Sequence, residues 1–512
     1  PGRNLELQPT VTASRTDVID SFPNGGLEKG DEDVDPGFTA RWGITPNTNL
    51  SATINPDFSQ VETDSAQLEV NTRFALFYPE KRPFFLEGAD LYLTPLQAVF
   101  TRTVADPDWG VKVNTKEGKN ALGVFLADDD INNLVIPGNQ GSATTSLDQS
   151  ITSGVVRYRR DIGQYSTLGV LYTGREGDDY HNRVAGLDGF FRFTPSDTVR
   201  VQYLSSDTLY PRQLAQNFGQ EIDAFDGDAF HVQYDHFAKL WKGYVSYQDL
   251  DPRFRADSGF IPRVDVKTAT AQGERFIYGG KEDWYARMSV GAKGFRTEDH
   301  TGRLTDQLAE VFGTLAGPLQ SQVELYVDRA KTYYNGETFD LNQQTFFFQI
   351  NPSGSLRLRL QGQLGDQIDF ANTRLGDLVY LIPGVQIRGR NLSLQLDHYY
   401  QTLDVEKTLD LKGGQLFKVN LTQAKVIYQF NVRTFVRAIV QYQDLKRNPE
   451  LYFRTVRPKQ EDLFGQFLFS YKLNPQTVLF AGYTDSRLGF QNVDLTQTDR
   501  TFFLKVGYAL LY

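Results

Sequence analysis

Few side chains in this sequence have the spacing that catalytic or metal-binding motifs require. The histidines are His181, His231, His236, His300 and His398. His231 and His236 are five residues apart, so on a β-strand they would face opposite sides. The sequence contains no HExxH, GxSxG or Walker-type motif. We therefore expect no catalytic residues, no enzyme activity and no cofactor; the alternative is a hydrolase built on a Ser–His pair.

Acidic clusters are the other candidates for ligand chemistry. They are Asp31-Glu32-Asp33, Asp128-Asp129-Asp130 and Asp178-Asp179. Ca²⁺ requires several oxygen ligands, but none of these clusters has the spacing of an EF-hand loop. We expect solvated loops, or loops that face lipopolysaccharide, and no metal site.

Basic side chains recur at alternating positions that would face one side of a sheet. They are Lys112, Arg157, Arg159, Arg192, Arg200, Arg287, Arg357, Arg359 and Arg437. In a pore, rings of Arg or Lys favour anions or polar sugars. The alternative is that these cations pair with Glu324, Asp328, Asp397 or an element inside the pore, which would leave little selectivity.

The elements that must position these residues are predicted to be strands. Between residues 97 and 512, most segments alternate apolar and polar residues over about 9–13 positions. In the segment from Ser355 to Gln363, one face carries leucines and the opposite face carries arginine and glutamine. Strands of soluble sandwiches and propellers average about 5–6 residues, whereas transmembrane strands need about 9–11. The pattern therefore favours an all-β, single-chain outer-membrane β-barrel.

Composition agrees with a membrane barrel and excludes other classes. The 512 residues include 37 Phe and 26 Tyr, which is too aromatic for a disordered chain. No apolar run approaches the roughly 18 residues of a transmembrane helix, and the absence of Cys excludes disulfides and thiol chemistry. The net charge of -10 argues against nucleic acid as a partner. Because the sequence starts at Pro1 without a signal peptide, we expect a processed chain or a fragment.

Connections alternate between short and long, as they do in bacterial outer-membrane barrels. The predicted long loops include Asp128 to Ser150, Ser206 to Asp226, Asp404 to Gln415, Lys446 to Asp462 and Arg487 to Asp499. At the C-terminus, an apolar face runs from Phe502 to Tyr512, as in the closing strand that the barrel-insertion machinery recognises. Counting Gln67 to Tyr78 as a strand gives about 26 strands, with 24 as the alternative.

The N-terminal fifth contains the most specific sequence motif. It reads Asn55-Pro56-Asp57-Phe58-Ser59-Gln60-Val61-Glu62, then Asp64, Asn71-Thr72-Arg73-Phe74 and Phe77-Tyr78-Pro79-Glu80-Lys81-Arg82-Pro83-Phe84-Phe85-Leu86-Glu87-Gly88. A second motif is Phe254-Arg255-Ala256-Asp257-Ser258-Gly259-Phe260-Ile261-Pro262-Arg263, followed by Asp265. Together they resemble an uncharacterised family of outer-membrane barrels, a domain of unknown function of Gram-negative bacteria. The resemblance implies a barrel that commonly follows a domain similar to carbohydrate-binding module family 9.

A barrel this wide is not filled by its own wall side chains, so we expect an open channel or a plug formed by residues 56–90. Candidate plug or gate residues are Asp57, Glu62, Asp64, Glu80, Lys81, Arg82 and Glu87. The alternative is a turn that fixes the register, in which these charges satisfy one another.

These observations predict a bacterial outer-membrane barrel for passage or uptake of a polar solute, with carbohydrate suggested by the resemblance alone. The alternatives are a plugged barrel that anchors a surface or periplasmic partner, and an outer-membrane enzyme. Expected partners are outer-membrane lipid, lipopolysaccharide, the insertion machinery at the strand ending in Tyr512, and a protein at the loops.

Overall fold

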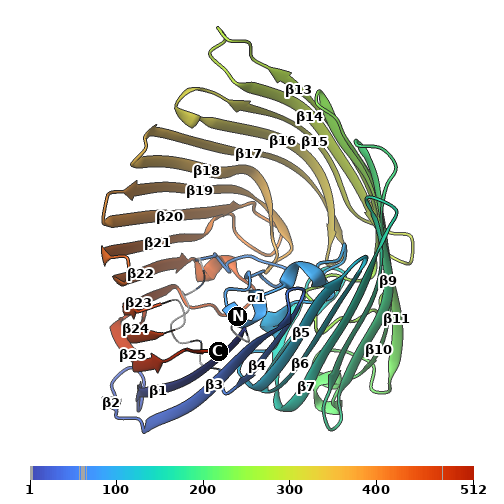
Figure 1. Cartoon of the computed structure of the whole chain (residues 1–512). Coiled ribbons are helices and arrows are strands. Elements are labelled where there is room, and N and C mark those ends of the chain that lie inside the picture. Colours follow the sequence, from blue (N-terminus) through green and yellow to red (C-terminus); the bar gives the residue numbers. More distant parts are fainter. Residues whose placement is uncertain (1–3, 57, 59–63, 65, 475–476) are drawn as a thin grey trace.

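The fold is a large antiparallel β-barrel (Figure 1). The computed structural model describes residues 4–56, 58, 64, 66–474 and 477–512. In this part of the chain, 26 strands form one sheet, but β2 (Leu27–Glu28) and β26 (Leu510–Leu511) have only two residues each. The other 24 strands form the wall. The alternative prediction of 24 strands is therefore the number in the barrel wall, and the two short strands bring the total to 26.

The strands of the wall follow one another around the barrel in chain order. The first twelve after the N-terminus are β1 (Leu5–Ile19), β3 (Glu32–Thr45), β4 (Thr48–Ile54), β5 (Pro107–Glu117), β6 (Asn120–Ile136), β7 (Ala143–Ile162), β8 (Ser166–Glu176), β9 (His181–Arg192), β10 (Asp197–Leu209), β11 (Phe225–Phe237), β12 (Trp241–Leu250) and β13 (Val266–Tyr278). The remaining strands are β14 (Arg287–Glu298), β15 (Leu304–Ala316), β16 (Gln322–Tyr334), β17 (Glu337–Ser353), β18 (Leu356–Asp369), β19 (Arg374–Arg388), β20 (Leu392–Val405), β21 (Gly414–Asn431), β22 (Thr434–Arg447), β23 (Lys459–Lys472), β24 (Val478–Phe490) and β25 (Val493–Gly507).

The first and last strands close the barrel. β1 pairs with β3 on one side and with β25 on the other, from Thr10↔Gly507 to Val18↔Asp499. β26 extends the same contact through Glu6↔Leu511 and Leu7↔Leu510. Closure satisfies the backbone groups that a free sheet edge would leave in lipid. The C-terminal segment therefore completes the wall.

The outer face of the wall is apolar and exposed. On the neighbouring strands β14, β15 and β16, Val290, Val311 and Val327 are 53%, 60% and 56% exposed. A contiguous apolar belt of this kind faces lipid hydrocarbon rather than water. The predicted fold class and location are confirmed: the protein is a β-barrel of the bacterial outer membrane.

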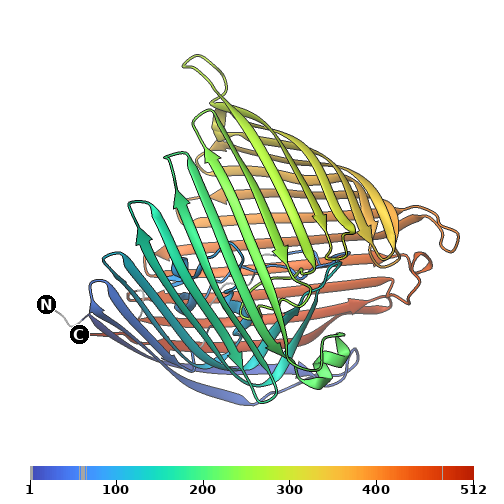
Figure 2. The same ribbon diagram turned by 90° about the vertical axis from the view of Figure 1, so that its right-hand side faces the viewer.

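The two rims of the barrel differ in the length of their connections. The two ends of the described chain lie at one rim (Figure 2), where β3–β4 and β21–β22 are joined by two residues each. Longer connections lie at the other rim, including the β10–β11 connection with helix α2 (Arg212–Asn217). Two predicted long loops are corrected: most of 128–150 and of 487–499 extends the strand pairs β6–β7 and β24–β25. Short turns mark the periplasmic rim of such barrels.

The described part of the connection between β4 and β5 runs through the inside of the barrel (Figure 1). It contains α1 (Pro83–Leu86) and the 3-10 turns η1 (Ala89–Tyr92) and η2 (Thr101–Thr103). Two further 3-10 turns, η3 (Pro318–Gln320) and η4 (Pro449–Leu451), lie in other connections. In the described residues, no helix combines the length and apolar character required to cross a membrane.

The prediction of a strand from Gln67 to Tyr78 is wrong. This segment lies within the barrel and has no strand pairing. Ala66 and Leu68 instead pack with their side chains into an apolar cluster that includes Leu403 and Leu421 of the wall. The alternating apolar pattern thus reflects an extended chain packed on a wall, which periodicity alone does not distinguish from a strand.

Candidate functional site in the barrel lumen

The lumen contains an inward-folded segment, called the plug below, which consists of Asp64 and residues 66–106. Pro83 occupies the first turn of α1, where its missing N–H costs no hydrogen bond. This short helix buries Phe84 and Phe85 against the inner wall, with the Phe85 ring 5.7 Å from that of Phe125 on β6. The segment extends past the predicted end at residue 90, because Leu91, Leu96 and Val104 belong to the same buried cluster.

Charged plug residues are paired with one another. The Arg82 guanidinium donates hydrogen bonds to the Glu80 carboxylate at 2.7 and 2.9 Å and to the carbonyl of Thr101 at 2.9 Å. Burial pushes the pKa of Glu80 up, but the hydrogen bonds and charge of Arg82 outweigh it and leave that pKa below its usual value. The arginine also lies over the Phe85 ring at 4.1 Å. This pair fixes the turn before α1.

The other plug candidates fall into separate places. Asp64 accepts a hydrogen bond from Arg102 at 2.6 Å and lies 3.5 Å from Lys81. Glu87 lies apart from them, near Arg41 of β3, at 3.7 Å. Asp57 and Glu62 lie outside the described residues. Arg102, which sequence reasoning missed, is thus the main partner of the Asp64 carboxylate.

The two sequence motifs, separated by about 170 residues, meet inside the barrel. The rings of Phe77 and Phe260 are 5.3 Å apart, and each also contacts Phe100, at 5.2 and 5.4 Å. The backbones are joined where the Phe100 N–H donates to the Ser258 carbonyl at 2.7 Å and the Phe260 N–H donates to the Gln97 carbonyl at 2.9 Å. The β12–β13 connection therefore fixes the plug through these ring contacts and backbone hydrogen bonds.

Arginines of both motifs converge on one aspartate of the wall. Arg263 of the second motif donates to Asp306 of β15, and Arg73 of the first lies 3.6 Å from the same carboxylate. Burial lowers the pKa of Arg73, and the Asp306 charge opposes that shift. Asp306 carries no signal in the local sequence, because it belongs to neither motif.

A buried carboxylate anchors the second motif itself. Asp257 accepts hydrogen bonds from the hydroxyls of Tyr180 and Tyr210, at 2.8 and 3.1 Å. Burial raises the pKa of Asp257, and the nearby Arg175 and the two tyrosines only partly oppose this. The direction is opposite to that of Glu80, because hydroxyls stabilise a carboxylate less than a paired guanidinium does.

The predicted basic residues share the inner face, but the plug covers only some of them. Lys112 donates to the carbonyls of Phe84 and Glu87, and Arg157 donates to the Leu91 carbonyl at 3.2 Å and to Asp188 at 2.8 Å. These two cations are 3% and 2% exposed, so they bind the plug rather than face a channel. On β22, Arg437 is also buried and donates to Gln466 at 3.2 Å.

The other basic candidates lie away from the plug contacts. Arg200 pairs with Asp235 at 3.1 Å, Arg359 pairs with Asp397 at 2.6 Å, and Arg357 donates to Asn351 at 3.2 Å. Arg287 is exposed and lies 5.4 Å from the Phe276 ring. Arg192 is exposed at the end of β9, where it donates to the carbonyl of Pro195 at 2.8 Å, and Arg159 is half-buried. Several of these cations thus have carboxylate partners.

Glutamines are the prevailing side chains on the inner face of β17 to β23. The strand register places Arg359, Gly384 and Asp397 side by side on this inner face. Leu358 and Leu396 lie on the opposite, outer face and are exposed. Its amides are those of Gln343, Gln349, Gln361, Gln363, Gln386, Gln395, Gln401, Gln423, Gln441, Gln443, Gln460 and Gln466. Alternation predicts the polar face, but the amide character of this whole arc appears only when the strands are placed side by side.

A polar cavity of about 630 Å³ separates the start of the plug from this arc. The plug side of the cavity includes Asp64, Gln67, Glu69 and Tyr78, and the wall side includes Gln441, Gln443, Arg447, Gln460 and Asp462. Burial raises the pKa of the Tyr78 hydroxyl, and the neighbouring Glu69 and Asp64 charges add to this. The cavity therefore offers amide, carboxylate, guanidinium and phenol groups to a solute.

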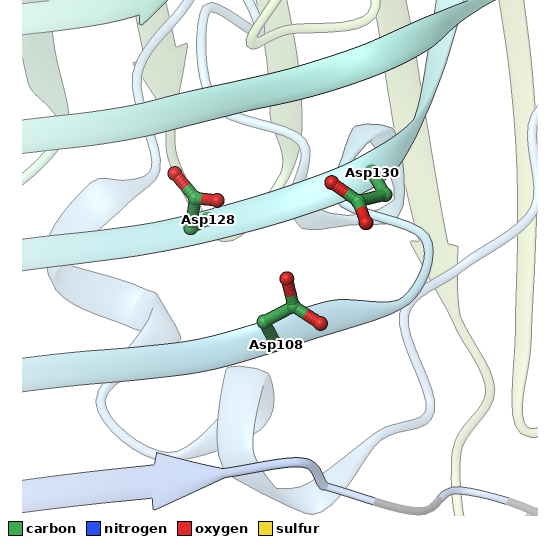
Figure 3. A group of neighbouring side chains, drawn as sticks. All are labelled: Asp108, Asp128 and Asp130. Atoms are coloured by element: carbon green, nitrogen blue, oxygen red, sulfur yellow. The ribbon is translucent and has the colours of Figure 1, made fainter.

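The fold places the three residues of the Asp128-Asp129-Asp130 cluster on different faces of the wall. The carboxylates of Asp108, Asp128 and Asp130 converge on the outer side of β5 and β6, within 4.8 Å of one another (Figure 3). Asp129 points inward instead and accepts a hydrogen bond from the backbone N–H of Asp106 at 3.1 Å. Three carboxylates are oxygen ligands of the kind that Ca²⁺ takes, yet exposed acidic groups commonly lie together without an ion. The absence of a metal site therefore stays a prediction.

Comparisons with known proteins bear mainly on the fold. A family described as a domain of unknown function (DUF5916) matches residues 4–117. No curated protein sequence matches the chain. Among solved structures, it is similar to the ferric enterobactin receptor PfeA from Pseudomonas aeruginosa, with 10% identity, a TM-score of 0.41 and coverage of 79% of this chain and 86% of that one.

Two further solved structures are similar. The FrpB iron transporter from Neisseria meningitidis (F3-3 variant) has 9% identity, a TM-score of 0.44 and coverage of 98% of this chain and 81% of that one. The siderophore receptor PirA from Acinetobacter baumannii has 11% identity, a TM-score of 0.41 and coverage of 79% and 85%.

Proposed function

We propose that the barrel lets a polar solute pass through the part of its lumen that the plug leaves uncovered. The supporting observation is that inner-face side chains between β13 and β18, and Arg200 near the start of β10, remain exposed with the plug in place. The Arg200 side chain is 45% exposed, and Arg287 and Gln361 are exposed as well. In Figure 1, the described plug lies toward β3–β7 and β21–β23 rather than beside β13–β18.

The character of the inner face favours polar solutes over apolar ones. Arginine, glutamine and acidic side chains replace most of the hydration that a hydroxylated solute loses on entry. Carbohydrate is the class that the family resemblance suggests. Passage, not catalysis, is the activity that we propose, in a wall whose apolar outer face contacts lipid and lipopolysaccharide.

Single-channel recording in a planar bilayer tests passage. We expect the purified, folded barrel to give steady conductance, and a salt gradient will report its preference between anions and cations. The folded state is checked beforehand by the heat-dependent shift in electrophoretic mobility that barrels display. Folded protein that gives no conductance would contradict passage through an open lumen.

A second candidate function is docking of a partner on the plug. Its motivation is that Phe77, Leu86 and Leu93 are 42%, 48% and 72% exposed although they belong to the plug rather than to the lipid-facing belt. Exposed apolar groups in an aqueous space mark interaction surfaces. If a Leu86→Ser/Leu93→Ser variant retains every partner that wild type cross-links in whole cells, docking at this surface is wrong.

A further inference from the structure

We propose that the cavity between the plug and strands β22–β23 is a binding site for an uncharged, polyhydroxylated solute such as a short saccharide. This inference rests on the proposed function, since it names the class of solute that would pass. It adds a specific site to a wide lumen that by itself would discriminate little.

The amides on the wall side are the first argument. Gln441, Gln443 and Gln460 lie on adjacent strands and face the cavity together. Each amide both donates and accepts hydrogen bonds, as each sugar hydroxyl does. Several groups of this kind on one wall suit a solute that carries many hydroxyls better than a compact ion.

The charges of the cavity are the second argument. Asp64 is already paired with Arg102 at 2.6 Å, and Asp462 accepts from the Gln460 and Gln443 amides at 3.1 and 3.3 Å. These carboxylates repel anions, and their existing partners reduce their attraction for free cations. A neutral solute that accepts and donates hydrogen bonds loses the least solvation free energy on entering this site.

The free donors are the third argument. Within the described residues, the half-buried guanidinium of Arg447 has no hydrogen bond or ion pair, although it borders the cavity. A guanidinium can donate two parallel hydrogen bonds to vicinal hydroxyls. On the opposite side, the Tyr78 hydroxyl stays protonated and is hydrogen-bonded to Glu69, so a third carboxylate of the cavity has a partner as well. The guanidinium of Arg447 therefore offers its donors to a hydroxylated solute in the cavity.

Calorimetric titration of the whole chain tests the site. An amine-oxide detergent is used, because sugar-headed detergents would compete. The neutral probes are maltotriose, cellobiose and raffinose, and the charged probes are glucuronate and spermidine. We expect at least one neutral probe to bind more tightly than both charged ones. Failure of all three neutral probes, or tighter binding of a charged probe, overturns the proposal.

Variants locate the binding. We expect Gln441→Leu/Gln443→Leu to weaken binding at least about tenfold, since two lost hydrogen bonds correspond to about one decade in affinity. The matched control is Gln361→Leu, which removes an inner-face amide outside the cavity and should change affinity less than about twofold. Equal loss in both variants would place binding elsewhere and overturn the assignment.

A swelling assay separates this inference from the proposed function. Liposomes containing the barrel are diluted into the same neutral saccharides, and the swelling rate reports passage. Binding without swelling would refute passage and keep the site. Swelling without binding would refute the site and keep passage.

Discussion

The inner wall has two regions that differ in what covers them. From β4 to β12, the plug and the β12–β13 connection bury the wall, and glycines allow their close approach: a Cβ on Gly123 would lie 2.7 Å from Leu91 and Tyr92 side-chain atoms. From β13 to β18, inner polar side chains such as Arg287 and Gln361 stay exposed. Strands with the same alternating pattern thus form an anchoring surface in one region and a solvated surface in the other.

Removing the plug should have the largest effect on this difference. The ends of the plug are close together, because Ile54 of β4 pairs with Trp109 of β5. A short Gly-Ser linker replacing residues 66–104 therefore leaves the wall intact. We expect conductance to rise several-fold and the covered wall to become as accessible as the open one. Unchanged conductance in folded protein would mean that the plug does not restrict the lumen.

Exchanging one arginine in each region should give a smaller, unequal effect. Arg157→Met leaves Asp188 unpaired beside the plug, and breaking such a buried pair costs about 3–5 kcal/mol. Arg287 of the open wall is exposed and lies beside the Phe276 ring, so we expect Arg287→Met to cost at most about 1 kcal/mol, as for exposed substitutions. Urea unfolding in lipid vesicles measures both. Equal losses would contradict the distinction between a covered and an open wall.

Acidification should have the smallest effect, confined to the covered region. The pKa of Glu80 is lowered in the folded protein, so its stabilising contribution is complete above about pH 4.3 and is lost as pH falls through the lower folded value. For Asp257 the pKa is raised in the folded protein, so the pH dependence is reversed. Its stabilising contribution is complete below about pH 3.9 and is lost as pH rises through the raised folded pKa. We expect conductance to increase below pH 4 as the plug loosens.

Two variants assign this pH response. Glu80→Gln should remove the increase, because the amide does not titrate. The matched control Asp257→Asn should retain it, because Asp257 anchors the second motif more firmly when protonated. An increase of the same size in Glu80→Gln would assign the response to another group.

Sequence alone predicted the wall of the barrel and part of the plug. Alternation is a local property, so the inner-face position of Arg359 and the outer-face position of Leu358 follow from their neighbours along the chain. The pairing of Glu80 with Arg82 also follows from adjacency in a turn. The same logic failed for Gln67 to Tyr78, where an extended, packed chain has the periodicity of a strand.

Tertiary structure decided which inner-face residues are covered and what they bind. The Asn71 side chain accepts a hydrogen bond from the Phe370 N–H at 3.0 Å across 299 residues of sequence, and Arg73 and Arg263 share Asp306. No local pattern encodes such partners, because they depend on the number of strands and on how the barrel closes. The strand pattern is therefore fixed residue by residue, whereas the site exists only once distant strands enclose one lumen.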